Sequence, residues 1–240
     1  MCRLLKQVLL VHVFLFALAE QAIADSLSDA RSAYSAGNYA TAAKLIRPLA
    51  EQGDAFAQFS LGGMYALGRG VPQDNKEAIK WLQLAAEQGD ARAQFNLGIM
   101  YANGQGVSQD YEVAAKWYRL AAEQNYIYGQ RNLGEMYALG QGVTQDDNEA
   151  IKWYRLSAEQ GDAEAQYNLG IMYEQGKGVP QDYKEAVRWY LLAAEQGDAE
   201  AQYNLGTMYE QGKGVPQDYK EAEKWHRLST ELLRMPEVTD

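Results

Sequence analysis

The stretch that decides the fold is residues 89–124, GDARAQFNLGIMYANGQGVSQDYEVAAKWYRLAAEQ. Asp90 can cap a helix, because its carboxylate accepts the free amide hydrogens of a first helical turn. The apolar residues that follow at helical spacing predict one buried stripe: Ala93, Leu97, Met100 and Tyr101. Gly104 and Gly106 end this helix, and Asp110 can cap a second one. The stretch therefore predicts two short helices joined by a glycine-rich turn.

The same pattern recurs every 36 residues along the chain. Tryptophan keeps this step at Trp81, Trp117, Trp153, Trp189 and Trp225, and tyrosine keeps it at Tyr65, Tyr101, Tyr137, Tyr173 and Tyr209. A glycine also recurs inside the first helix of each pair, at Gly62, Gly98, Gly134, Gly170 and Gly206. Glycine in a helix costs roughly 1 kcal/mol relative to alanine. Its recurrence predicts that two helices cross closely there.

Repeated helix pairs bury their apolar faces by stacking on one another. The fold class predicted is all-α, an α/α superhelical solenoid of stacked antiparallel helix pairs. The five repeats expected are residues 53–88, 89–124, 125–160, 161–196 and 197–232. Residues 25–52 are expected to form a shorter N-terminal capping pair that resembles a tetratricopeptide unit and lacks the glycine-rich turn. Residues 233–240 follow the last helix as a tail.

The N-terminus has the pattern of a cleaved signal peptide. Arg3 and Lys6 precede an apolar run, and Ala22 and Ala24 form a small-x-small cleavage site. The apolar run is shorter than the roughly 20 residues that span a bilayer, so a membrane anchor is the weaker alternative. We expect residues 1–24 to be removed and the product to be periplasmic or secreted, with no membrane span.

Composition excludes several function classes. With 22 Lys+Arg against 32 Asp+Glu, the formal net charge is −10, and no basic stripe is present to bind nucleic acid. The one cysteine, Cys2, lies within the predicted signal peptide, and the rest of the chain holds one histidine, His226. We predict no catalytic residues, no metal site and no cofactor. The Gly-x-Gly turns lack the flanking strand of a phosphate-binding loop and are interpreted as helix ends.

Several motifs together resemble the Sel1-like repeat family, relatives of tetratricopeptide repeats. They are AEQGDAEAQYNLG at residues 194–206, Met208-Tyr209, Gly212-x-Gly214-Val215, Gln217-Asp218-Tyr219 and Glu221-Ala222. The resemblance covers residues 53–232 and implies a scaffold that binds other proteins, in envelope signalling, cell-wall processes or host contact. A cell-wall-active hydrolase and a carbohydrate-binding solenoid are the alternatives. The repeated aromatic residues are expected in the core, with a sugar-stacking ladder as the other interpretation.

The candidate partner-binding residues come from three patterns. Positions of the first helices that vary between repeats include Arg92, Glu135, Glu164 and Glu200. An asparagine ladder is formed by Asn96, Asn132, Asn168 and Asn204; it either bonds the backbone of a partner or satisfies neighbouring helix ends. The third repeat departs from the pattern at Tyr128 and Arg131, residue types enriched at interface hot spots, although drift with local repacking also accounts for it. We expect a monomer that binds an extended segment or helix of a protein partner in a concave groove.

Overall fold

The computed structural model describes residues 25–231, and every regular element in this range is a helix. The all-α prediction is therefore confirmed. The predicted signal peptide, residues 1–24, and the tail, residues 233–240, lie outside the described residues.

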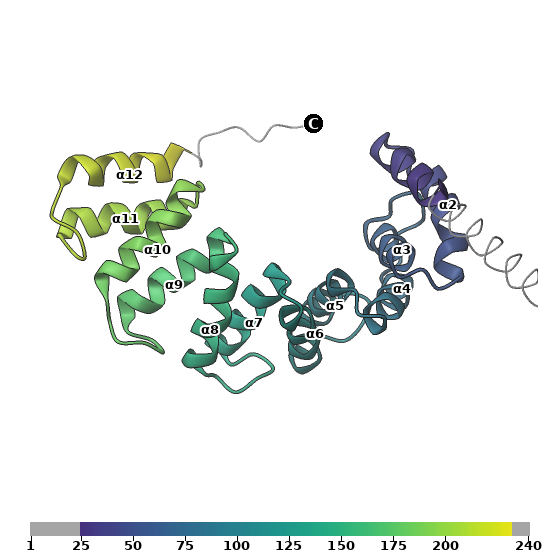
Figure 1. Ribbon diagram of the computed structural model, residues 1–240, viewed down its shortest axis with the longest axis horizontal. Helices are drawn as coiled ribbons and strands as arrows, with labels where there is room; N and C mark the ends of the chain where they lie inside the picture. Colours follow the sequence, from purple (N-terminus) through teal and green to yellow (C-terminus); the bar gives the residue numbers. More distant parts are fainter. Residues whose placement is uncertain (1–24, 232–240) are drawn as a thin grey trace, which may run out of the picture. The chain divides into compact units, whose positions relative to one another are not determined.

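Two compact units divide the chain, residues 1–109 and 110–240. The first unit contains a helix over residues 25–35, followed by α2 (Tyr39–Glu51), α3 (Ala55–Leu67), α4 (Asn75–Glu87) and α5 (Ala91–Asn103). The second contains α6 (Tyr111–Glu123), α7 (Ile127–Leu139), α8 (Asp147–Glu159), α9 (Ala163–Gln175), α10 (Tyr183–Glu195), α11 (Ala199–Gln211) and α12 (Tyr219–Glu231). Within each unit every helix packs against the next one along the chain (Figure 1).

The tryptophans join each helix pair to the pair before it. Trp189 of α10 lies in the same buried cluster as Ile151 of α8 and Leu169 of α9. Trp225 of α12 likewise packs with Tyr190 of α10. The core placement expected for the repeated tryptophans is confirmed at Trp81, Trp153, Trp189 and Trp225, which are buried, whereas Trp117 is half-buried. Within each unit the helix pairs therefore stack as in a solenoid, with a core that continues from one pair to the next.

The predicted helix ends are confirmed in the second repeat. The Asp90 carboxylate accepts hydrogen bonds from the Arg92 and Ala93 amides, each at 3.0 Å. Gly104 ends α5 in the left-handed conformation, with φ 66°. The third repeat is built differently, because Tyr126 stands at the cap position of α7 and makes no capping hydrogen bond through its side chain.

Close helix crossing at the helical glycines is also confirmed. A Cβ atom at Gly62 would lie 2.8 Å from Leu82 Cγ, and one at Gly134 would lie 2.9 Å from Tyr154 Cδ1. Both neighbours are buried side chains of the second helix of the same pair. The two helices can approach this closely only because no side chain stands between them.

A buried glutamine in each first helix links successive repeats. Gln130 Nε2 donates to the Ala122 carbonyl at the end of α6, at 3.3 Å, and Gln130 Oε1 accepts from Gln160 Nε2 at 2.7 Å. Equivalent bonds to the preceding helix are made by Gln58, Gln94, Gln166 and Gln202. Each of these carbonyl groups also accepts a backbone amide just beyond its helix, as Ala122 does from Asn125 at 3.0 Å, so the glutamine adds a second donor from the next repeat. The sequence analysis missed this role, although these glutamines keep the 36-residue step.

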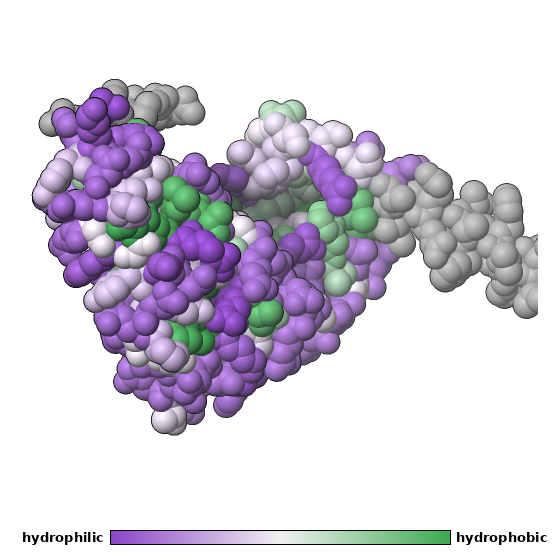
Figure 2. Space-filling view, turned by 60° about the vertical axis from the view of Figure 1, so that its left-hand side comes forward, coloured by the Kyte–Doolittle hydropathy of each residue, from purple (hydrophilic) through white to green (hydrophobic). Residues whose placement is uncertain are grey.

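Hydrophilic residues cover most of the surface seen in Figure 2, and apolar residues gather in a few small areas. None of the helices within residues 25–231 combines the length and the apolar character needed to cross a membrane.

Candidate functional site

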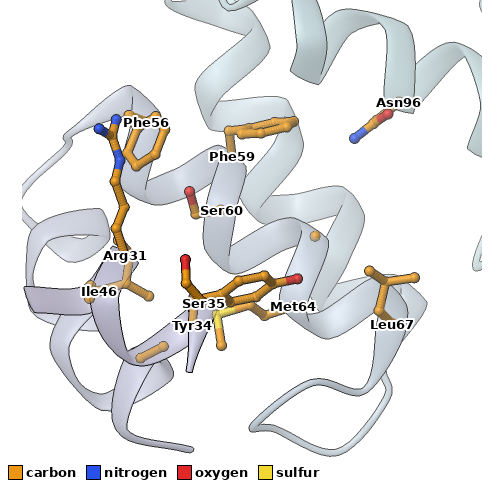
Figure 3. A pocket seen from close by; sticks show the side chains of 13 residues that line it. Arg31, Tyr34, Ser35, Ile46, Phe56, Phe59, Ser60, Met64, Leu67 and Asn96 are labelled. Atoms are coloured by element: carbon orange, nitrogen blue, oxygen red, sulfur yellow. The ribbon is translucent and has the colours of Figure 1, made fainter. Parts of the chain in front are cut away.

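An apolar hollow of about 410 Å³ opens in the first unit, between the helix over residues 25–35 and α3 (Figure 3). We call it the aromatic hollow. Phe56, Phe59, Met64 and Leu67 of α3 form one wall, and the other residues that line it are Ala30, Arg31, Tyr34, Ser35, Ala42, Ile46, Ser60, Gly63 and Asn96. Its volume lies within the range of about 300–1,000 Å³ that is usual for ligand sites.

Two guanidinium groups stack on the phenylalanines of this wall. Arg31 lies against the Phe56 ring (Figure 3), with its guanidinium carbon 4.7 Å from the ring centre. Arg92 of α5 lies over the Phe59 ring at 4.3 Å. The two cations differ in their charge partners. Arg92 is paired with Asp90, with Nε 3.2 Å from Oδ1. Among the residues that the structure describes, Arg31 makes no ion pair and is exposed.

Tyr34 holds the mouth of the aromatic hollow in place. Its ring packs edge-on against Tyr39 at 4.9 Å, and its hydroxyl accepts a hydrogen bond of 2.7 Å from Arg69 Nη1. These contacts tie the helix over residues 25–35 to the glycine-rich turn after α3. Contacts with Tyr39 and Arg69 therefore hold the Tyr34 side chain in place at the mouth of the hollow.

A second hollow of about 480 Å³ lies in the second unit, and we call it the acidic hollow. Its charged lining consists of Glu135, Asp147, Glu164, Asp198 and Glu200, with Lys177 as the one cation. Its apolar and aromatic lining consists of Ala138, Leu139, Tyr154, Tyr167, Ile171 and Met172, together with Asn168. The first hollow is thus mainly apolar with an arginine at its rim, whereas the second is lined mainly by carboxylates.

Burial and nearby carboxylates raise the pKa values of several groups in the acidic hollow. Burial, together with the neighbouring charge of Glu164, raises the pKa of Glu135 above its ordinary value, while Arg131 opposes the shift. Burial also raises the pKa of Asp198. The pKa of Tyr167 rises to about 12, mainly because of burial and of its hydrogen bond to Glu200. The tyrosines of this hollow therefore remain neutral at physiological pH.

The structure brings all three predicted glutamates, Glu135, Glu164 and Glu200, together with Asn168 in the acidic hollow. Asn96 lies in the other unit, where it lines the aromatic hollow. Asn132 and Asn204 are half-buried, and Asn204 lies beside the phenols of Tyr167 and Tyr190. The asparagines of the predicted ladder therefore do not share one site: Asn96 lines the aromatic hollow, and Asn168 lines the acidic hollow.

Arg131 and Tyr128 of the third repeat have separate roles. Arg131 Nη1 lies 3.2 Å from Asp162 Oδ2 and 2.8 Å from Glu164 Oε2, so its half-buried side chain connects α7 to the start of α9. The Tyr128 ring lies under the Arg131 guanidinium, 5.4 Å from it, and remains 44% exposed. Arg131 therefore joins two repeats, and Tyr128 is the accessible member of the pair.

His226 of α12 stands at the repeat position that Tyr154 and Tyr190 fill in other repeats. Its side chain packs against α11. Its ring lies 5.2 Å from the Tyr203 ring, and its Nε2 is 3.5 Å from Thr207 Oγ1. Within residues 25–231, no three His, Cys, Asp or Glu side chains are grouped so as to hold a metal ion.

Five consecutive segments of the chain match the Sel1 repeat family: residues 55–90, 91–126, 127–162, 163–198 and 199–232. The chain belongs to the Sel1 repeat family. Each matched Sel1 segment begins two residues later than the repeat predicted from the sequence, where the first helix itself starts, as at Ala55 of α3. Sel1 repeat solenoids typically mediate protein–protein interactions.

Solved structures of other Sel1 repeat proteins are similar to this chain. A Sel1 repeat protein from Oxalobacter formigenes shares 38% identity with a TM-score of 0.81, covering 87% of this chain and 83% of its own. The protective antigen c5321 of uropathogenic Escherichia coli shares 39% identity with a TM-score of 0.84 over 89% of this chain, which spans 47% of the antigen's length. A putative Sel1 repeat protein from Klebsiella pneumoniae shares 27% identity with a TM-score of 0.50, covering 79% of this chain and 92% of its own. No curated protein matches the sequence.

Proposed function

We propose that this Sel1 repeat protein is an exported, non-catalytic scaffold that binds a protein partner on the surface formed by its first helices. The proposal rests on the difference between two kinds of position along these helices. Positions that repeat every 36 residues, such as Leu61 and Leu97, are fully buried. Positions that vary line the hollows: Phe56 and Gly63 line the aromatic hollow, and Glu135 and Glu164 line the acidic hollow.

This division is what a binding scaffold requires. Repeated positions hold neighbouring helix pairs together, so they are constrained by packing in every repeat. Varying positions that line a hollow are not fixed by this repeated packing, so they can carry specificity. The aromatic hollow and the acidic hollow differ in lining although they arise from the same repeat, which favours recognition of a particular surface.

Export forms part of the proposal because of the charged, apolar and small-x-small pattern of residues 1–24. Expression of the full chain with a C-terminal tag in a Gram-negative host, followed by fractionation and N-terminal sequencing, tests it. We expect a product in the periplasm or medium that begins at Asp25. An intact product found with the cytoplasmic proteins would contradict export.

A crosslinking pull-down with the exported chain tests the scaffold role. The captured protein is purified and its affinity is measured for the wild type and for variants altered in each hollow, Gly63→Ile and Glu164→Lys. We expect a direct complex that at least one of the two variants weakens. The proposal is wrong if every captured protein binds the wild type and both variants with the same affinity.

A further inference from the structure

Gly63 of α3 lines the aromatic hollow and places no side chain in it. Gly63 stands at a first-helix position that is filled by Ile99, Glu135, Ile171 and Thr207 in the other repeats. A Cβ atom at Gly63 would meet nothing within 4 Å, so a side chain there would extend into open space. Phe56 and Leu67 flank this opening, and Leu67 is 61% exposed. An apolar side chain of a partner can therefore enter the hollow beside Gly63.

The charge of Arg31 at the rim of the hollow favours a partner that carries a carboxylate next to that apolar side chain. Arg31 lies over the Phe56 ring and has no carboxylate partner among residues 25–231. A guanidinium held on an aromatic face keeps its outward N–H groups in a fixed plane, which suits a carboxylate acceptor. Arg92, on the neighbouring helix, is already neutralised by Asp90. Arg31 thus offers an uncompensated positive charge at the rim.

The two units differ in how they would receive an acidic segment. Residues 25–109 contain 7 Lys+Arg against 8 Asp+Glu, whereas residues 110–240 contain 13 against 23. The first unit is therefore close to neutral, and the strongly acidic second unit would repel carboxylates. Selection between the two hollows follows from charge, with an acidic segment accepted only in the first unit.

We propose that the aromatic hollow binds an extended protein segment in which a bulky apolar side chain lies next to an acidic residue. The apolar side chain enters beside Gly63, between Phe59 and Leu67, and the acidic side chain pairs with the Arg31 guanidinium. This proposal rests on the scaffold function and names the partner chemistry of one surface.

A peptide-display selection on the exported chain tests this recognition directly. Random twelve-residue peptides displayed on phage are selected on the wild type, and the enriched sequences are synthesised with a fluorescent label. We expect a consensus that places Leu, Phe, Met or Trp within two residues of Asp or Glu. A basic consensus, or the lack of any enriched peptide, would overturn the proposal.

Three variants locate the site by fluorescence polarisation with the selected peptides. Gly63→Ile fills the hollow with a residue found at the same position in two other repeats, and we expect affinity to fall more than about 10-fold. Arg31→Glu should weaken the acidic peptide about 3- to 10-fold, because the rim is exposed to solvent. It should also bind a peptide in which the acidic residue is replaced by lysine better than the wild type does. Lys44→Glu, an exposed charge change on α2 outside the hollow, is the matched control and should leave affinity unchanged.

Circular dichroism verifies that the variants keep their helices. Should Gly63→Ile not fold, Leu67→Ser removes the exposed wall of the hollow without touching the core, and it should weaken the peptide as well. Peptides that bind all the hollow variants as tightly as the wild type would disprove this site while leaving the scaffold function intact. Failure of both the peptide selection and the pull-down would remove the scaffold function too.

Discussion

At the scale of single residues, glycine has two opposite roles in the first helices. Gly134 permits close crossing, because a Cβ atom there would lie 2.9 Å from Tyr154 Cδ1. Gly63 faces open space, and a Cβ atom there would meet nothing within 4 Å. Sequence alone shows both as helical glycines, and only their neighbours separate the packing role from the pocket-forming one.

This difference predicts opposite effects of the same substitution. Gly134→Ala gains about 1 kcal/mol of helix propensity but overpacks against a buried tyrosine at a cost of about 1–3 kcal/mol, so we expect a net loss of stability. Gly63→Ala should instead stabilise the chain by about 0.5–1 kcal/mol. Urea unfolding followed by circular dichroism measures both variants. Equal effects of the two substitutions would show that the crossing at Gly134 is not tight.

Glu135 provides a second test at this scale, through pH. Its side chain stays partly in contact with solvent, and its pKa is raised in the folded chain, mainly by partial burial and next by Glu164, so folding disfavours the ionised form by a small amount. The wild type therefore regains stability as pH falls through the raised folded pKa towards the unfolded value of about 4.3. Glu135→Gln cannot ionise, so it should be more stable than the wild type at pH 7, with the difference disappearing near pH 4.

Thermal unfolding of the wild type and of Glu135→Gln at pH 7 and pH 4 measures the effect. Glu123→Gln, an exposed change outside the acidic hollow, serves as the control and should shift stability little at either pH. A Glu135→Gln variant less stable than the wild type at pH 7 would show that attraction to Arg131 outweighs burial.

At the scale of helices, the start of α9 is tied to the preceding repeat. Asp162 Oδ1 accepts from the Ala165 amide at 2.8 Å, and Asp162 Oδ2 accepts from Arg131 Nη1 at 3.2 Å. The Asp162 side chain is only 5% exposed. One carboxylate therefore caps a helix and also pairs with a cation from α7.

We expect Asp162→Ala to cost about 2–3 kcal/mol. A cap is worth about 0.5–2 kcal/mol, and loss of a hydrogen bond to a charged group adds about 1.5–3 kcal/mol, part of which Glu164 can recover. Asp110→Ala removes an exposed cap that bonds the Val113 amide, and it should cost about 1 kcal/mol. Urea titration of the two variants compares them, and similar losses would mean that the Arg131 pair contributes nothing.

At the scale of the whole molecule, each helix pair depends on its neighbours in the stack. Trp189 of α10 completes the cluster that contains Leu169 of α9 and Ile151 of α8. A separate cluster in the first unit contains Leu61 and Trp81. Stability in such arrays is close to a sum of repeat terms and nearest-neighbour terms.

Leu169→Ala, which opens a cavity at a fully buried position, should cost about 2–5 kcal/mol. Hydrogen exchange should then show faster exchange in α8, α9 and α10, with α2, α3 and α4 nearly unchanged. A uniform loss of protection in both units would instead show that the chain unfolds in one cooperative step.

The sequence by itself determined the repeat, the helix pairs and most helix ends, because these depend on local interactions. Asp90 caps a helix through amides two and three residues away, and Gly104 ends one through its own backbone angles. Burial of the repeated leucines and tryptophans followed from helical periodicity.

Only the tertiary structure decided how varying positions combine. Arg31 and Phe56 meet across two helices, Arg131 pairs with Asp162 in the next repeat, and Gly63 leaves an opening only because nothing approaches it. These arrangements depend on how helices from successive repeats are spaced, which a 36-residue pattern does not specify. The physical reason is that side chains meet through packing between elements, whereas caps and stripes form within one.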